Sequence, residues 1–143
     1  MFLKFNNVLL EKGTKLNSES IMLTINFVNT ARESLQNTIK IYINEIANVV
    51  SPPSTRDEFD LLTLSEPIFH TFNLSYGKLI RMNIDVTELV KKVINLDDWS
   101  SGNSIMFILK VDDDSDLYMK SYDFTDNPIK SSSLSRHISY NII

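Results

Sequence analysis

The chain has 143 residues, a length typical of a single domain that can bury its own hydrophobic core. Its composition, 43% hydrophobic and 22% charged, is typical of a folded globular protein and excludes a disordered acidic chain. The formal net charge of −4 speaks against a basic nucleic-acid-binding surface, and the absence of cysteine excludes disulfides, thiolate zinc sites and cysteine nucleophiles. We therefore expect one domain over residues 1–143, with no nucleic acid among its partners.

The first segment, "MFLKFNNVLLEKG", is apolar but lacks the features of a targeting segment. Lys4, Asn6 and Asn7 interrupt it, and it has no small-residue cleavage site of the kind that ends a secretory signal. No apolar stretch of the sequence approaches the length that a membrane-spanning helix needs. We therefore expect either a protein made in the cytosol or a domain of a larger protein, in both cases without membrane insertion.

Most of the chain alternates between apolar and polar residues, which is the pattern of half-buried β-strands. In residues 20–28 the apolar side chains fall on every second position, and residues 38–46 repeat this pattern. Both segments are rich in β-branched isoleucine, which favours strand over helix. Strands are predicted over residues 2–10, 20–28, 38–46, 104–111, 116–124 and 135–143, and in two pieces over residues 67–86 around the turn "SYGK".

Two segments depart from this pattern. Residues 51–60, "SPPSTRDEFD", are predicted to form a loop, because prolines deny hydrogen-bond donors to a strand. Residues 85–96 are predicted to form an amphipathic helix that begins with Asp85 and Glu88 as a capping pair. Its apolar face consists of Val86, Leu89, Val90, Val93 and Ile94. Together these elements predict an all-β protein, an antiparallel jelly-roll-like β-sandwich with one short amphipathic helix.

Few side chains are available for catalysis. His70 and His137 are the two histidines, and neither accompanies a serine-nucleophile motif or the H-E-x-x-H zinc motif. The three glycines are isolated, so no phosphate-binding loop is predicted. A pair of carboxylates acting as in a glycosidase stays open, because two such acids can come from any part of the sequence. We expect a non-enzymatic protein without catalytic residues.

An acidic stretch in the last third of the chain has two interpretations. Asp112, Asp114 and Asp116 alternate as the ligands of a calcium-binding loop do, and Asp123 falls at the last ligand position of that spacing. The match is incomplete, because Leu117 stands where such loops have glycine and no helix precedes them. The alternative is a solvated turn between two strands, where aspartate is common. Calcium is the one cofactor that the sequence suggests.

Three aromatic residues near this stretch are candidates for stacking on a sugar ring: Trp99, Tyr118 and Tyr122. Alternation places the two tyrosines on one face of the strand predicted over residues 116–124, where they would lie side by side. Trp99 follows the predicted helix, where a tryptophan commonly covers the core with its ring while its N–H bonds to a carbonyl. Trp99 is therefore either part of a sugar-binding surface or a structural cap of the core.

Four segments in this order resemble one family of β-sandwich modules: "LKFNNVLLEKGTKLNSESIMLTINF", "IKIYINEIANVVSPPS", "IDVTELVKKVINLDDWSSGNSIMFILKV" and "HISY". The order is similar to that of DNRLRE-type modules, which occur in bacterial surface proteins and in virion structural proteins of tailed phages, cyanophages included. The shared features are the turn "EKGTK", Glu45 before a variable loop, the helix entry at Asp85–Thr87, "WSSGN" before a buried strand, and a last strand near Tyr140. The final strand keeps the family pattern only in part, as "SSSLSRHISY".

The resemblance implies a fold and a biological setting but no catalytic residue. Virion proteins assemble in the host cytoplasm and need no signal peptide, which favours a virion component over a secreted adhesin. The expected function is that of a structural or capsid decoration protein of a phage, oligomeric or bound to a lattice of other virion proteins. Residues 51–60 would serve as an adaptable contact, with Tyr118 and Tyr122 as anchors. The alternative is an extracellular or cell-surface carbohydrate-binding module that recognises a glycan by aromatic stacking, with calcium.

Overall fold

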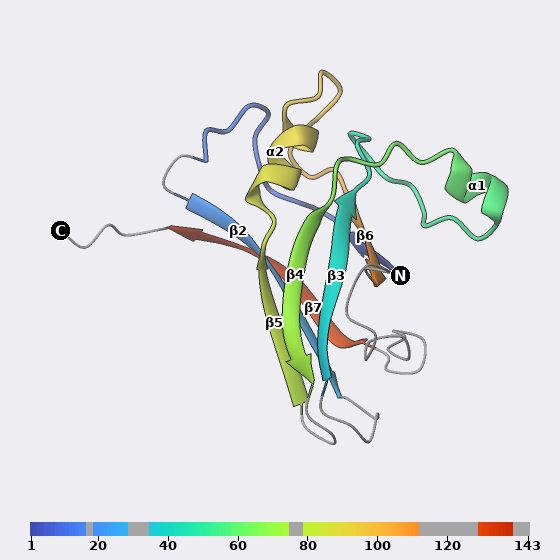
Figure 1. The fold of residues 1–143 in the computed structure, drawn as a ribbon. Coiled ribbons are helices and arrows are strands. Elements are labelled where there is room, and N and C mark those ends of the chain that lie inside the picture. The colour runs from blue at the N-terminus through green and yellow to red at the C-terminus, as the bar shows by residue number, and fades with distance from the viewer. Residues whose placement is uncertain (17–18, 29–34, 75–78, 112–128, 139–143) are drawn as a thin grey trace.

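The computed structural model describes residues 1–16, 19–28, 35–74, 79–111 and 129–138 (Figure 1). Within them the elements are β1 (Phe2–Phe5), β2 (Glu19–Val28), β3 (Leu35–Ile43), α1 (Arg56–Asp60), β4 (Ile68–Leu74), β5 (Leu79–Asp85), α2 (Thr87–Ile94), β6 (Ile105–Val111) and β7 (Ile129–Ile138). The strands form two antiparallel sheets, a four-stranded sheet in the order β1-β6-β3-β4 and a three-stranded sheet in the order β5-β2-β7. Most connections between successive strands cross from one sheet to the other, as they do in a jelly roll. The predicted all-β antiparallel sandwich is confirmed.

The core lies between the two sheets and follows from the alternation of the strands. In β2 every second side chain is buried, and the same holds for the inner face of β3. The inner-facing residues of these two strands are Ile21, Leu23, Ile25, Phe27, Ile39, Ile41 and Ile43. β6 is buried on both faces, because Met106 and Ile108 on its outer face are covered by Phe59 and other side chains of the segment between β3 and β4. This double burial explains why β6 has a continuous apolar sequence.

Helix α2 closes one end of the sandwich (Figure 1). Its buried side chains are Thr87, Leu89, Val90, Val93 and Ile94, so the predicted apolar face is confirmed. The backbone N–H of Ile21 donates to Thr87 Oγ1 at 2.9 Å, which ties the start of the helix to β2. Asp85 accepts from the N–H of Thr87 as a capping residue would, but Glu88 does not reach back and instead pairs with Lys91. The predicted capping pair is therefore wrong, because the cap position belongs to Val86, which has no side-chain capping bond, and the helix begins at Thr87.

The segment 51–60 contains a short helix, α1, where the sequence predicted only a loop. The Thr55 side chain accepts a hydrogen bond from the N–H of Glu58, and Glu58 Oε2 accepts one from the N–H of Ser54 at 2.7 Å. The hydrogen bonds that the Glu58 carboxylate accepts from the backbone N–H and the hydroxyl of Ser54 lower its pKa, the backbone bond most of all. T-x-x-E is the sequence signal of such a capped helix start, and the two prolines before it lie outside the helix.

Strand bounds differ from the prediction at both ends of the chain. β1 ends at Phe5 rather than at residue 10, because Asn7 adopts a φ of 55° and turns the chain out of the sheet. β7 begins at Ile129, six residues before the predicted start at residue 135. The strand predicted over residues 116–124 and the end of the one predicted over 135–143 lie outside the described residues. Neither helix in the described part of the chain is long and apolar enough to cross a membrane.

Candidate functional site

Trp99 is the predicted site residue that lies in the described part of the chain. Its side chain is 3% exposed, and its Nε1–H donates to the carbonyl oxygen of Leu10 at 2.8 Å. A ring buried in this way has no free face for a sugar, so the structure places Trp99 as a cap of the core and not in a stacking surface. Tyr118, Tyr122, Asp112, Asp114 and Asp116 lie outside the described residues, and the calcium and tyrosine hypotheses stay predictions. Among the residues that are described, no three His, Asp or Glu side chains form a group that could hold a metal ion.

The segment after α2, "DDWSSGN", joins three parts of the chain. Gly102 has a φ of 97°, which favours glycine, and its N–H donates to the carbonyl of Val8 at 2.9 Å. The N–H of Val8 donates in turn to the carbonyl of Asn103. The Asn103 side chain donates to the carbonyl of Ala47 at 2.7 Å. This joint therefore fixes the path of residues 6–10 against the end of the sandwich.

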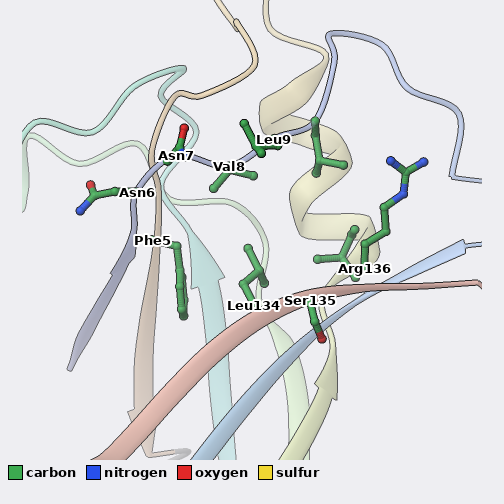
Figure 2. A pocket seen from close by; sticks show the side chains of 10 residues that line it. Phe5, Asn6, Asn7, Val8, Leu9, Leu134, Ser135 and Arg136 are labelled. Atoms are coloured by element: carbon green, nitrogen blue, oxygen red, sulfur yellow. The ribbon is translucent and has the colours of Figure 1, made fainter.

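A pocket of about 290 Å³ opens beside this joint, at the edge of the sandwich where β1 and β7 come together (Figure 2). We call it the edge pocket. It is formed by β1 and the segment after it, by β2, and by β7, and it is lined by Phe5, Asn6, Asn7, Val8, Leu9, Leu10, Ile21, Leu134, Ser135 and Arg136. Six of these residues are hydrophobic, so the pocket is mainly apolar.

One wall of the edge pocket is the irregular segment that follows β1. Val8 and Leu10 turn into the core, whereas Leu9 between them is 71% exposed at the rim. The Trp99 and Gly102 bonds hold the carbonyls of Leu10 and Val8 in place. The wall is therefore fixed by hydrogen bonds although it belongs to no sheet.

The opposite wall is β7. Leu134 pairs with Leu23 and Arg136 with Ile21, so both face the inner side of the sheet, while Ser135 faces the outer side. Figure 2 shows Leu134 extending between the sheets toward Phe5, and the Ser135 side chain pointing to the other side of β7. Because Ser135 still lines the pocket, the backbone of β7 forms part of this wall.

Arg136 supplies the charge of the edge pocket. Its guanidinium makes an ion pair with Glu19 on the neighbouring strand β2, and the two side chains are 43% and 21% exposed. In such a half-exposed position the pair contributes about 0–1 kcal/mol to folding. The pair therefore orients the guanidinium at the rim and leaves part of it in contact with solvent.

A second apolar surface lies on the outer face of the four-stranded sheet, around α1. Lys110 Nζ lies 4.9 Å from the centre of the Phe59 ring and 5.5 Å from that of Tyr42. Val50 and Leu61 are strongly exposed on either side of α1 in sequence, and Phe69 is exposed on β4. Residues 51–60, the predicted adaptable contact, thus include a helix that covers part of a sheet.

Comparison with protein-family models, with curated proteins and with solved structures gave no match. The resemblance to DNRLRE-type modules therefore stays a prediction from the quoted segments.

Sequence reasoning did not find the edge pocket. Two signals were present in the sequence. The pair Asn6–Asn7 interrupts the alternation of residues 2–10, and Leu134 and Arg136 are two positions apart, so that a strand would place both on one face. Neither signal shows that the first and the last described strands lie at the same edge, because that depends on the order of strands in two sheets.

Proposed function

We propose that the chain is a non-enzymatic structural or decoration component of a phage virion, and that it binds another particle protein through the edge pocket. The observation that carries the binding site is a concave, mainly apolar pocket with an exposed leucine, Leu9, at its rim. Protein interfaces concentrate their binding energy where a bulky side chain of one partner fills such a pocket on the other.

The size of the edge pocket supports a single bulky side chain as its occupant. Its volume of about 290 Å³ lies just below the range of about 300–1,000 Å³ for pockets that hold drug-sized molecules. A large aliphatic or aromatic side chain removes apolar surface from water at about 25 cal/mol per Å², which is the main source of affinity in such a contact.

The chemistry of the lining favours a protein over a glycan. Sugar hydroxyls buried without partners would each cost about 1–3 kcal/mol. Phe5 is the one ring in the lining, and it packs edge-on against Phe107 with 6.0 Å between ring centres. The aliphatic residues that a hydrocarbon group would contact are Val8, Leu9, Leu10, Ile21 and Leu134.

The virion setting rests on the resemblance of Asp85–Leu109 to virion modules. In this chain "WSSGN" supports one wall of the edge pocket through the Trp99, Gly102 and Asn103 hydrogen bonds. A "WSSGN" segment that made the same hydrogen bonds in another virion module would support the same wall of an edge pocket. This would connect the motif with the proposed binding surface.

The test is pairwise co-expression of the tagged chain with each particle protein encoded beside its gene. We expect one of these proteins to co-purify in stoichiometric amount. Leu9→Asp should abolish this, because a charge at the rim opposes burial of an apolar side chain. Leu61→Asp is the matched control: Leu61 is 80% exposed but belongs to the α1 segment, so its variant should still co-purify.

Two results would contradict the proposal. One is the absence of any co-purifying particle protein from genes for capsid or tail components. The other is specific binding on a glycan array that is lost in Tyr118→Ala or Tyr122→Ala, which would favour the carbohydrate-binding alternative.

A further inference from the structure

The outer face of β6 carries an apolar patch where the outer face of a sandwich is ordinarily polar. Met106 and Ile108 point away from the core between the sheets, yet they are 0% and 1% exposed. The described residues that pack against them include Phe59 and Leu62. Both belong to residues 50–62, which carry α1 in the connection between β3 and β4 and which we call the α1 strap (Figure 1). The α1 strap is therefore a cover of the apolar patch.

Both ends of the α1 strap are fixed to the sandwich by hydrogen bonds. Before it, the N–H of Ser104 donates to Asn48 Oδ1 at 3.0 Å, and the Ser104 hydroxyl donates to the carbonyl of Val49. After it, the N–H of Glu45 donates to the carbonyl of Thr63 at 2.7 Å. The chain between these bonds can move while the bonds themselves stay in place.

Between its ends the α1 strap has few polar contacts with the described part of the sandwich. Its hydrogen bonds there are internal, such as those between Glu58 and Ser54, apart from the bond from Lys4 Nζ to the carbonyl of Val50 at 2.6 Å. None of the five residues of α1 is buried. A segment with few buried contacts opens locally at a lower free energy than the whole domain unfolds.

Phe59 contacts the sandwich at three places. Its ring lies 6.0 Å from the Phe2 ring, measured between ring centres, and it packs against the apolar patch. Lys110 Nζ lies 4.9 Å from the centre of the Phe59 ring and 5.5 Å from that of Tyr42, which is the geometry of a cation–π contact. Leu61, in contrast, is 80% exposed and adds little to the cover. Phe59 is therefore the residue that holds the α1 strap closed.

We propose that the α1 strap is a lid, which opens as a unit about its two fixed ends while both sheets stay folded, and which uncovers the apolar patch of Met106 and Ile108. Its internal hydrogen bonds move with it, because they join residues of the strap to one another. Opening breaks the contacts of Phe59 and leaves the pairing of β6 with β1 and β3 intact. The inference goes beyond the proposed function, because the patch and its cover share no residue with the edge pocket.

The test uses the absence of cysteine, since one introduced thiol is then the single site of labelling in the chain. Ile108→Cys places a thiol under the α1 strap. Leu109→Cys is the matched control, because it places a thiol on the same strand in the core between the sheets. The rate of reaction with excess thiol reagent is measured at increasing urea and compared with the rate that the global unfolding of each variant allows.

We expect Ile108→Cys without urea to react at least about 10-fold faster than its global unfolding allows, because the lid opens more often than the domain unfolds. The rate should depend little on urea at low concentration, since opening exposes little surface. Leu109→Cys should react only as fast as its global unfolding allows. Met106→Cys replaces Ile108→Cys if the latter does not fold, because Met106 is buried under the same cover.

Two matched pairs of substitutions, made in the Ile108→Cys chain, test whether the α1 strap is the cover. Phe59→Ala should raise the labelling rate at least about 10-fold, whereas Leu61→Ala should not change it. Phe59→Leu should give a smaller rise and replaces Phe59→Ala if the latter does not fold. Lys110→Gln should raise the rate about 2- to 5-fold by removing the cation–π contact, whereas Lys130→Gln, on the other sheet, should not.

Two results would overturn the inference. If Ile108→Cys reacts no faster than its global unfolding allows, with the urea dependence of Leu109→Cys, the patch is exposed only when the sandwich unfolds. If it reacts fast but the substitutions of Phe59 leave its rate unchanged, the α1 strap is not the lid. Neither result bears on the proposed function, which is judged by co-purification with particle proteins.

Discussion

The two edges of the sandwich are filled in different ways. At the edge formed by β4, Phe72 packs between Phe27, with the ring centres 5.9 Å apart, and His70, with the ring centres 6.4 Å apart. At the edge formed by β1 and β7, the inner side chains are mainly aliphatic and leave the edge pocket. Two edges of one core thus differ because rings fill a wide space that leucine and valine do not. The first edge contributes to folding, and the second leaves a space, which the proposed function assigns to a partner.

The largest effect is expected from a substitution at the edge formed by β4, which we call the filled edge. Phe27→Ala should destabilise the protein by about 3–5 kcal/mol, because it removes a fully buried ring and its contact with Phe72. Leu134→Ala at the edge pocket should cost less than about 2 kcal/mol, because Leu134 is half-buried beside an existing space. Urea denaturation of the two variants measures the difference. Equal costs would contradict the distinction between the edges.

A smaller effect is expected at the joint that supports the edge pocket. Trp99→Phe keeps most of the buried ring but leaves the carbonyl of Leu10 without its 2.8 Å bond. An unsatisfied buried acceptor costs about 1–3 kcal/mol, which denaturation in urea would show. Because Leu10 lines the pocket, the same variant should also lower the affinity for the particle protein that the proposed function expects to bind there. Unchanged binding would mean that this wall is not part of the contact.

The ion pair at the rim should matter little for folding. Arg136→Gln is expected to lower the free energy of unfolding by at most about 1 kcal/mol, since both partners are partly exposed. The loss should shrink in 1 M salt, where the charges are screened. A cost of several kcal/mol that salt does not change would indicate a structural arginine instead of a binding one.

The smallest effect is a pH dependence at the filled edge. Partial burial lowers the pKa of His70 below its ordinary 6.5, because desolvation disfavours the charged imidazole. Between the folded and the unfolded pKa, the unfolded chain binds more protons at His70 than the folded chain does. The contribution of His70 to the free energy of unfolding is therefore fully present above pH 6.5 and decreases as the pH falls below 6.5. Denaturation at pH 7.5 and 5.5 should show this decrease, and His70→Gln should reduce it. An identical decrease in the variant would assign the effect to other groups.

The sequence predicted most of the paired strands, because their isoleucines and leucines alternate with a period of two. It missed residues 129–134 of β7, where serines replace the apolar residues of an ordinary strand. One of those serines has a polar partner on the neighbouring strand, because the hydroxyl of Ser131 accepts a hydrogen bond from the Asn26 side chain of β2 on the outer face of the sheet. Such cross-strand partners follow from the register, which the sequence of one strand does not contain.

The candidate site was harder to predict than the fold. The sequence indicated Tyr118, Tyr122 and the aspartates because aromatic and acidic residues cluster there, whereas Leu9, Leu134 and Arg136 are ordinary residues of which the first is far from the other two in sequence. Their proximity depends on where β1 and β7 lie in two different sheets. The sequence left Trp99 open between a sugar-binding surface and a cap of the core, and its burial and its bond to the carbonyl of Leu10 decide for the cap.

The most direct test of the edge pocket as a binding surface is hydrogen exchange on the chain alone and in complex with the particle protein that co-purifies. Binding there predicts slower exchange of backbone amides in residues 5–10 and 129–138, with the α1 segment unchanged. Protection of residues 49–64 without any change in β7 would contradict it and place the partner on the outer face of the four-stranded sheet.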